Sequence, residues 1–188
     1  MNDSWEKLFG ECASCTACEL SKTRTNCVFG VGSKSADILF VGEAPGDNED
    51  KTGIPFVGRA GQLLNNYFDE VGISRDSVYI ANILKCRPPK NRDPLPSEEA
   101  ACIDFLRRQI ALLNPKMIVC LGRISATKLI RPDYKITREH GEWLERDGML
   151  ITAVYHPALL LRDPRKKDGM LTDMKKIKEK LDEIRGSL

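Results

Sequence analysis

The stretch "DILFVGEAPGDNED", residues 37–50, decides the fold because its character changes abruptly in the middle. Residues 37–42 are apolar and include branched and aromatic side chains. A run this short is typical of a buried β-strand rather than of a helix. Gly42 and Gly46 then predict a backbone that turns sharply and leaves room for a flat ligand. We therefore expect a buried strand that leads directly into a functional loop.

Three more apolar runs have the length and composition of this first strand. We predict strands over residues 78–84, 117–122 and 150–156. Polar or sharply turning residues follow each run. In sheets of parallel strands the carboxyl ends meet at one edge, which is where ligands bind. The four segments that follow the strands are therefore expected to form one site.

Helical patterns separate the strands. The predicted helices cover residues 59–72 and 96–115, the segment after Gly122, and residues 171–186. The first ends at Gly72, a typical C-cap residue, and the second has Ser97 as its predicted N-cap. Alternating strands and helices predict an α/β protein with three α/β/α layers and a central, mostly parallel, four-stranded sheet. The length of 188 residues fits a single domain, 1–188.

Composition excludes several classes of protein. The formal charge of +2 is nearly balanced, so global charge does not indicate a nucleic-acid partner. The N-terminal segment lacks the pattern of a secretion signal, and no apolar run approaches the roughly 18 residues of a membrane span. We expect a soluble, cytoplasmic protein with no membrane partner. Seven cysteines in such a compartment favour metal ligation or free thiols over disulfides.

Three of these cysteines lie in "GECASCTACEL", residues 10–20, at every third position: Cys12, Cys15 and Cys18. This spacing is found in both zinc and iron–sulfur sites, so it does not decide the metal. A bacterial ferredoxin run needs a further cysteine where this chain has Lys22. Any fourth ligand must therefore come from a distant part of the chain. Cys86 and Cys102 are candidates, and Cys27 and Cys120 are expected to be free thiols.

Three polar residues lie at the predicted strand ends. Glu43 is either a surface or capping group or part of a site between two glycines. Asn82 lies inside an apolar strand, where its amide must bond to a neighbouring loop or read a ligand edge. His156, before Pro157, is either structural or a donor to developing negative charge. His140 lies in a polar segment and is expected at the surface.

Basic residues gather in two proline-containing segments. Residues 85–92 carry Lys85, Arg87, Lys90 and Arg92, and residues 162–167 carry Arg162, Arg165, Lys166 and Lys167. Each is either a solvated loop or a phosphate contact. The first loop has neither the GxxxxGK[ST] nor the GxGxxG form, so nucleotide hydrolysis and dinucleotide binding are not supported.

The motifs together resemble a known family. They are "CTACEL" (15–20), "VGEAPGDNEDKTGIPFVGRAGQLLN" (41–65), "NILKCRPPKNRDP" (82–94), the helix with Cys102, and "HPALLLR" (156–162). In this order and with these gaps the chain is similar to the family 4 uracil-DNA glycosylases, the iron–sulfur branch of that superfamily, from about Cys15 to Asp173. The resemblance implies release of uracil from DNA and a 4Fe-4S cluster, of structural rather than redox function. Its implied ligands are Cys15, Cys18, Cys86 and Cys102, with Cys12 as a spare.

The resemblance also implies how uracil is recognised. A uracil must be rotated out of the duplex before its glycosidic bond can be attacked. Phe56 would stack on the rotated base, Asn82 would bond to its N3–H and O4, and Glu49 would close off the C5 edge, with Ala44 also in the base pocket. The implied substrate is uracil-containing DNA, single- or double-stranded, bound by a monomer.

Catalytic and DNA-binding roles follow from the same resemblance. His156 would stabilise charge at the uracil O2, and Glu43 and Asn91 match positions associated with the attacking water. Leu160 would be an apolar wedge in the minor groove, and we expect Arg162 and Arg165 to contact the backbone. The loop after Cys86 lacks the histidine of a branch that binds DNA covalently, which favours turnover. The alternative is a non-catalytic iron–sulfur or zinc module that binds nucleic acid.

Overall fold

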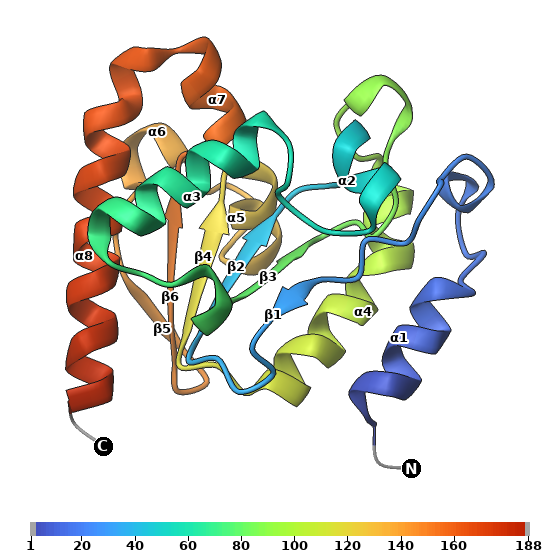
Figure 1. Ribbon diagram of the computed structural model, residues 1–188, viewed down its shortest axis with the longest axis horizontal. Coiled ribbons are helices and arrows are strands. Elements are labelled where there is room, and N and C mark those ends of the chain that lie inside the picture. Colours follow the sequence, from blue (N-terminus) through green and yellow to red (C-terminus); the bar gives the residue numbers. More distant parts are fainter. Residues whose placement is uncertain (1–2, 187–188) are drawn as a thin grey trace.

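A six-stranded mixed sheet forms the centre of the protein, as seen in a computed structural model that describes residues 3–186 (Figure 1). The strands are β1 Val31–Gly32, β2 Ile38–Gly42, β3 Tyr79–Asn82, β4 Met117–Leu121, β5 Leu144–Arg146 and β6 Met149–Val154. Their order is β1-β3-β2-β4-β6-β5, and the four central strands are parallel. These four are the predicted strands.

The two edge strands were not predicted. β1 pairs with β3 and β5 pairs with β6, both antiparallel. Each is only two or three residues long, and all of its residues are exposed, so neither has the apolar run by which a buried strand is identified. The α/β/α class is confirmed, and the sheet is mixed and larger than predicted.

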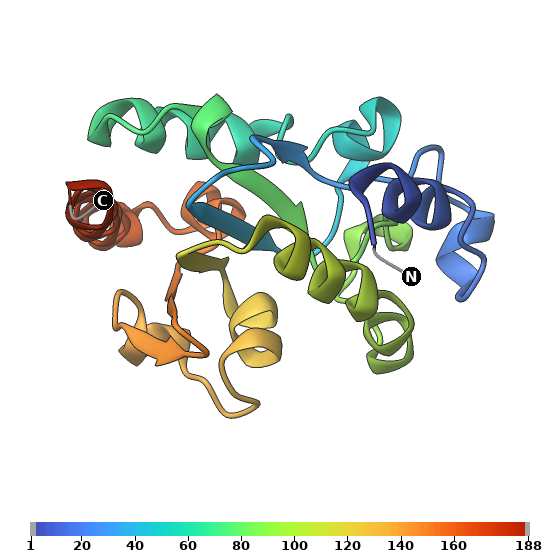
Figure 2. The same ribbon diagram turned by 90° about the horizontal axis from the view of Figure 1, so that it is seen from below.

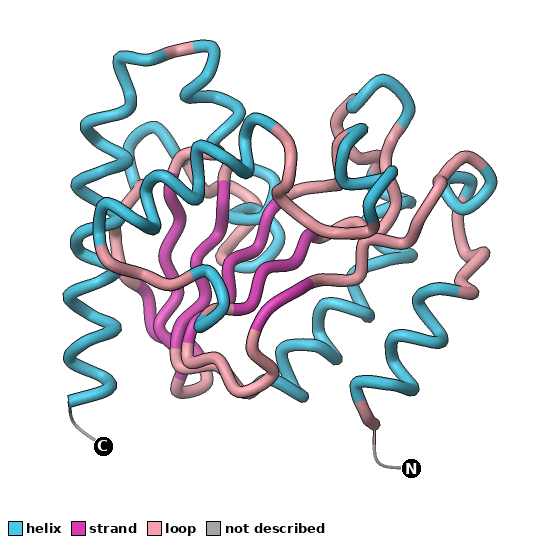
Figure 3. Tube along the Cα trace, viewed as in Figure 1, coloured by secondary structure: helices cyan, strands magenta, loops and turns pink. Residues whose placement is uncertain are grey.

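Helices cover both faces of the sheet (Figures 1 and 3). They are α1 Trp5–Ala13, α2 Asp47–Thr52, α3 Arg59–Val71, α4 Pro96–Leu113, α5 Arg123–Leu129, α6 Ile136–Glu139, α7 Pro157–Arg162 and α8 Lys167–Gly186. Short 3-10 turns are η1 Glu19–Lys22, η2 Arg75–Ser77, η3 Pro89–Asn91 and η4 Pro164–Lys166. Figure 2, viewed from below, shows α3 on one side of the sheet and α5 on the other.

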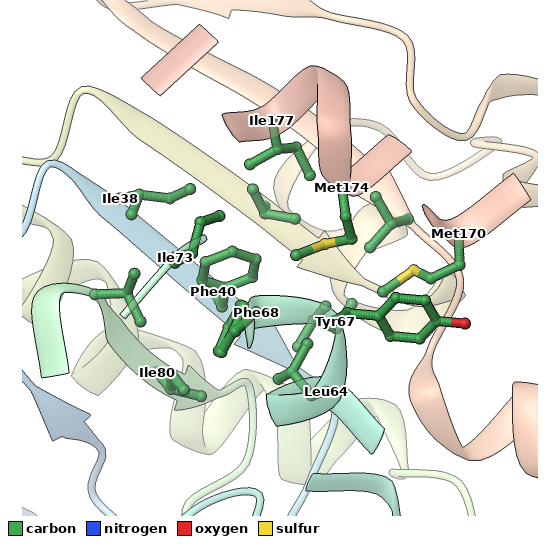
Figure 4. Packing of buried hydrophobic residues seen from close by; sticks show 14 of the residues in the cluster. Ile38, Phe40, Leu64, Tyr67, Phe68, Ile73, Ile80, Met170, Met174 and Ile177 are labelled. Carbon is green, nitrogen blue, oxygen red and sulfur yellow. The ribbon is translucent and has the colours of Figure 1, made fainter. Parts of the chain in front are cut away.

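Alternate side chains of each central strand enter different cores, because successive side chains of a strand point to opposite faces. Ile38 and Phe40 of β2 pack with α3 and α8. Figure 4 shows this core, in which Phe68 of α3 and Met174 of α8 lie against Phe40. Leu39 of β2 joins the other core, with α4 and α5. Burial on both faces explains why the strands are continuous apolar runs.

One predicted helix cap is wrong. Helix α4 begins at Pro96, and its N-cap is Leu95 rather than Ser97. The Glu98 carboxylate accepts a hydrogen bond from the Leu95 N–H at 2.9 Å. Proline suits the first helical position because it has no N–H to leave unpaired. The helix therefore starts earlier than the serine suggested.

The register of the parallel strands shows where their carboxyl ends lie. Gly42 pairs with Asn82, and Leu121 pairs with Val154, so the carboxyl ends of the four parallel strands are level. The loops that follow these strands therefore meet at one edge of the sheet. Within residues 3–186, no helix combines the length and the apolar character needed to cross a membrane.

Candidate active site

A cavity of about 650 Å³ lies at this edge of the sheet. Its lining includes Glu43 after β2, Asn82 at the end of β3, Gly122 after β4 and His156 after β6. Four strand ends thus contribute to one cavity, as the sequence predicts. The volume is within the usual range of small-molecule sites.

Asn82 is the most informative residue of the cavity. Its side chain is 1% exposed, and its Oδ1 atom has no hydrogen-bond partner among the described residues. A buried carbonyl oxygen without a partner costs about 1–3 kcal/mol. A methyl group at Gly42 would clash with this oxygen and would lie 2.6 Å from Cζ of Phe56. Glycine therefore lets the amide and the aromatic ring approach each other closely.

The backbone of Phe56 is strained. Its φ is 53°, a value that costs a non-glycine residue about 1–3 kcal/mol. Arg75 holds the preceding peptide, since its Nη2 donates to the carbonyl oxygen of Pro55 at 2.7 Å and its Nη1 donates to Asn65 Oδ1 at 2.7 Å. A methyl group at Gly61 would clash with the Phe56 backbone. The chain thus fixes the ring from two sides.

Glu49 holds the segment that follows Phe56. One carboxylate oxygen accepts from the N–H groups of Val57 and Gly58 at 2.9 and 2.7 Å, and the other accepts from the Gly46 N–H at 3.1 Å. This carboxylate joins the loop after β2 to the loop before α3. Glu49 lines the cavity while it makes these bonds.

His156 is a neutral imidazole with a defined tautomer. Burial, and secondarily the charge of Arg162, lower its pKa to about 4. Its Nδ1 accepts from the Ala158 N–H at 3.1 Å, so the remaining proton is on Nε2. The ring lies 5.7 Å from the Phe56 ring, with 34° between the planes. The histidine therefore offers one N–H donor beside the aromatic ring.

Glu43 is a carboxyl group whose ionisation changes near neutrality. Burial and the negative charge of Asp93 raise its pKa to about 7, while the positive charges of Arg123 and Arg162 oppose this rise. A carboxyl with this pKa can accept or hold a proton at physiological pH.

Asn91 lies at the far side of the cavity, in η3. Its φ is 54°, and its Oδ1 accepts from Arg87 Nε at 2.8 Å. Arg87 also forms an ion pair with Asp47 of α2 at 2.5 Å, so α2 and the loop around η3 lie side by side (Figure 1). Arg75 was not among the predicted site residues, and Arg87 was predicted only as part of a basic segment. Their partners are distant in sequence, so no local pattern identifies them.

The predicted wedge residue must be corrected. Leu160 is fully buried, and it packs in the core with α3 and α8. Its neighbour Leu161 is 40% exposed. Residues 157–162 are helical rather than an open loop, so only one side of the segment faces solvent. Arg162 is exposed and lines the cavity, and exposed Arg165 forms an ion pair with Asp163 at 2.8 Å.

His140, predicted at the surface, is partly exposed, with 25% of its side chain accessible, and it also contacts buried groups. Its Nδ1 lies 2.6 Å from an oxygen of buried Asp173, and its ring lies 4.4 Å from the ring of Tyr155. Burial raises the pKa of Asp173, and the bond to His140 opposes that rise. The pair joins the segment after α6 to α8.

Two apolar clusters contain cysteines of the N-terminal segment, and Cys120 lies apart from both, in the core of the sheet. Cys86 and Cys102 are buried in one apolar cluster with Leu20 and Leu84, and Cys18 packs against it. Cys12 belongs to a different cluster, with Leu8 and Phe29. Cys15 precedes Cys18 in the segment before η1 and is partly exposed.

Several N–H groups point at the sulfurs. The Lys85 backbone donates to Cys102 Sγ at 3.3 Å, Arg24 donates to Cys86 Sγ at 3.1 Å, and the Ala17 backbone donates to Cys15 Sγ at 3.5 Å. Such bonds stabilise thiolates and tune iron–sulfur clusters. Among the described residues, no three His, Cys, Asp or Glu side chains converge as ligands of one metal ion. A four-iron cluster binds each thiolate through a different iron, so its ligands need to be further apart. Cys18, Cys86 and Cys102 lie at one apolar wall, with Cys15 three residues before Cys18, and thiols are the donors that such a cluster takes.

Comparison with known proteins gives a consistent result. Residues 29–182 match the model of the uracil DNA glycosylase superfamily. The chain is 45% identical to the type-4 uracil-DNA glycosylase of Archaeoglobus fulgidus, covering 94% of this chain and 93% of the relative. It is 46% identical to that of Sulfurisphaera tokodaii (94% and 84%) and 48% identical to that of Thermotoga maritima (79% and 79%).

Proposed function

The chain belongs to the uracil-DNA glycosylase superfamily and to its type-4 family, and from this premise we propose how its residues divide the reaction. It is a DNA repair enzyme that hydrolyses the N-glycosidic bond of uracil in DNA. The products are free uracil and an abasic site. The roles of individual residues, given below, are our proposals.

Asn82 reads the base. The unpaired Oδ1 of this buried amide is the observation that carries the proposal, because a flipped uracil brings an N3–H donor that satisfies it. The other side of the amide donates to uracil O4. Cytosine presents the opposite pattern at both positions, so it leaves buried polar groups mismatched. Phe56, against Gly42 and Asn82, supplies the surface on which the ring stacks. Ala44 also lines this base pocket.

His156 stabilises the leaving group. Departure of uracil places negative charge on the base, with a large share on O2. A neutral imidazole whose Nδ1 is already occupied donates from Nε2 to that oxygen. The donor acts on charge that develops only in the transition state, so it accelerates cleavage rather than binding. The low pKa of His156 means that it donates a hydrogen bond without first being protonated.

Glu43 and Asn91 position the attacking water. Both line the cavity, and a carboxylate and an amide oxygen can each accept a hydrogen bond from water. Arg87 holds Asn91 in place. Glu43 performs this role in its ionised form, which places its activity above a pH of about 7.

Glu49 closes the C5 edge of the base pocket and also acts as a brace. Its three backbone bonds fix both loops at this side of the cavity. A thymine methyl group would meet a wall that cannot retreat without breaking these bonds. Exclusion of thymine thus follows from rigidity as well as from shape.

The exposed side of α7 contacts DNA. We assign the apolar wedge to Leu161, because Leu160 belongs to the core. Arg162 and Arg165 contribute positive charge beside it, and such contacts are independent of sequence. The substrate is uracil-containing DNA, single- or double-stranded. We propose a monomer that acts on DNA in the cytoplasm.

A 4Fe-4S cluster is the proposed cofactor, held by Cys15, Cys18, Cys86 and Cys102. It would supply structural cross-linking and no step of the hydrolysis. Cys86 precedes Arg87, so the ligands anchor the loop that carries Asn91. Protein purified without oxygen should contain about four irons per chain. Alanine at any of the four positions should lose iron, and Cys12→Ala should retain it; iron loss from Cys12→Ala alone would contradict this ligand set.

The function is tested by incubating the protein with uracil-containing oligonucleotides and cleaving abasic sites with alkali. Strand scission only at uracil supports the proposal, and the matched cytosine oligonucleotide is the control. Asn82→Ala should lose most of this activity while binding DNA. Binding without scission by the intact chain would instead indicate a non-catalytic module.

A further inference from the structure

A second pair of cysteines lies outside the proposed cluster. The Sγ atoms of Cys12 and Cys27 are 3.2 Å apart, and both residues are free thiols. Cys12 is at the end of α1 and is buried, whereas Cys27 lies between η1 and β1 and is partly exposed. A disulfide bond needs about 2.0 Å between the sulfurs. The two side chains are therefore already side by side, and only a small approach separates them from a bond.

The surrounding backbone holds this arrangement. The Val28 N–H donates to the Lys85 carbonyl oxygen at 2.8 Å, and the Asn26 side chain donates to the carbonyl oxygens of Asp50 and Lys51. Both neighbours of Cys27 are thus anchored. Cys12 is held among apolar side chains that include Leu8 and Phe29. The contact between the thiols is consequently a property of the fold.

The chemical difference between the two thiols suits a two-step exchange. The hydrogen bond from Cys12, with the positive charges of Arg24 and Lys85, lowers the pKa of Cys27. The same bond, with burial, raises the pKa of Cys12. The more exposed thiol is thus the better nucleophile, and the buried thiol lies beside it as a resolving group.

We propose that Cys12 and Cys27 form a reversible dithiol–disulfide site that reacts with small disulfides such as oxidised glutathione. The Cys27 thiolate attacks one glutathione sulfur, the S–S bond breaks, and one glutathione thiolate leaves and takes up the proton of Cys27. The Cys12 sulfur, losing its proton, then attacks Cys27 Sγ and releases the second glutathione. Two protein thiols are oxidised and one small disulfide is reduced to two thiols.

A disulfide between Cys12 and Cys27 would restrict the segment that carries two of the proposed cluster ligands. It closes the loop of residues 12–27, which contains Cys15 and Cys18. Arg24, in the same loop, already donates to the Ala13 carbonyl oxygen at 2.5 Å and to Cys86 Sγ. A covalent link across the base of this loop restricts its opening. On the proposed cluster assignment, the oxidised form keeps two of the four ligands close to the iron.

The test starts with reduced, cluster-loaded protein under nitrogen. It is treated with oxidised glutathione, quenched with N-ethylmaleimide and digested with trypsin. Lys22 and Arg24 lie between the two cysteines, so trypsin separates them. The peptide with Cys12, residues 8–22, also contains Cys15 and Cys18, so fragmentation of the linked peptide assigns the bond to Cys12. We expect a Cys12–Cys27 peptide, two hydrogens lighter than its parts, that dithiothreitol abolishes. We also expect iron release to a chelator to be at least about threefold slower after oxidation.

Matched variants complete the test. Cys27→Ser, and independently Cys12→Ala, should abolish the linked peptide and the oxidation-dependent slowing of iron release. Cys120→Ser, at a buried thiol in β4, should change neither. Absence of the linked peptide from folded wild-type protein overturns the proposal, and equal iron release by both forms overturns its consequence. A linked peptide in protein that never contains iron supports the dithiol site and refutes the cluster assignment alone.

Discussion

Arg75 gives the sharpest test of how the base pocket is held. The arginine is not among the residues that line the cavity, and it acts on Phe56 only through the Pro55 carbonyl oxygen. Arg75→Met removes the donors and keeps an apolar stem. Arg75→Lys restores one charged donor. We predict that Arg75→Met weakens uracil recognition without removing any group that touches the base.

The magnitude follows from two opposing energies. A hydrogen bond from a charged donor contributes about 1.5–3 kcal/mol, and the positive φ of Phe56 costs about 1–3 kcal/mol. Without the bond, the strained conformation loses a stabilisation of the same size as its cost. Each 1.4 kcal/mol changes a population tenfold. The fraction of molecules with a competent Phe56 should therefore fall by roughly tenfold to a hundredfold, and apparent affinity falls with it.

The assay measures steady-state cleavage and its inhibition by free uracil. For Arg75→Met, KM and the inhibition constant of uracil should both rise by roughly tenfold or more, with a partial return for Arg75→Lys. Arg108→Met is the matched control, because Arg108 of α4 does not line the cavity and pairs with Asp3 and with Glu11 of α1. An unchanged inhibition constant of uracil in Arg75→Met, or an equal rise of that constant in Arg108→Met, would show that the bond from Arg75 to Pro55 does not hold Phe56 in place.

Three further predictions concern single side chains. Burial of neutral His156 depresses its pKa from 6.5 to about 4, so this group stabilises the fold above pH 6.5 and its contribution is lost as pH falls to 4. Over that window the free energy of unfolding of wild type should fall by about 3 kcal/mol more than that of His156→Ala in urea titrations. Equal losses in the two proteins would contradict this. Single-turnover cleavage should rise with pH through about 7 as Glu43 ionises, and Glu43→Gln should be slower with a flat profile; an unchanged profile would exclude Glu43. Leu160→Ala should lower the free energy of unfolding by about 2–5 kcal/mol. Leu161→Ala should leave stability unchanged and should slow the cleavage of double-stranded substrate more than that of single-stranded substrate. The reverse pattern would restore Leu160 as the wedge.

The pattern of apolar residues along the chain was sufficient to predict the strands that are buried on both faces and the helix of residues 59–72. The central strands are continuous apolar runs, and helix 59–72 was placed almost to the residue because Leu64 and Phe68 share one face and Gly72 ends it. The edge strands β1 and β5 have no such pattern, because exposed residues are not constrained by a core. They are defined only by their pairing with β3 and β6.

The site shows the same division. Glu43, Asn82 and His156 could be placed together because each lies at or just after the carboxyl end of a parallel strand. Leu160 was misassigned, because exposure within a short helix depends on its rotation against the core, which three successive leucines do not reveal. The bonds of Arg75 and Arg87 join segments that only the folded chain brings together.

Selection of uracil by Asn82 can be measured directly as the release of free bases. Release of uracil and of cytosine from matched single-stranded oligonucleotides is compared for wild type and Asn82→Asp. Aspartate removes the donor to uracil O4 and supplies an acceptor for the cytosine amino group. We expect wild type to release uracil alone, and Asn82→Asp to lose most of its uracil activity and to gain weak release of cytosine, more readily at lower pH. Full uracil activity in Asn82→Asp would contradict the assignment of this buried amide as the base reader.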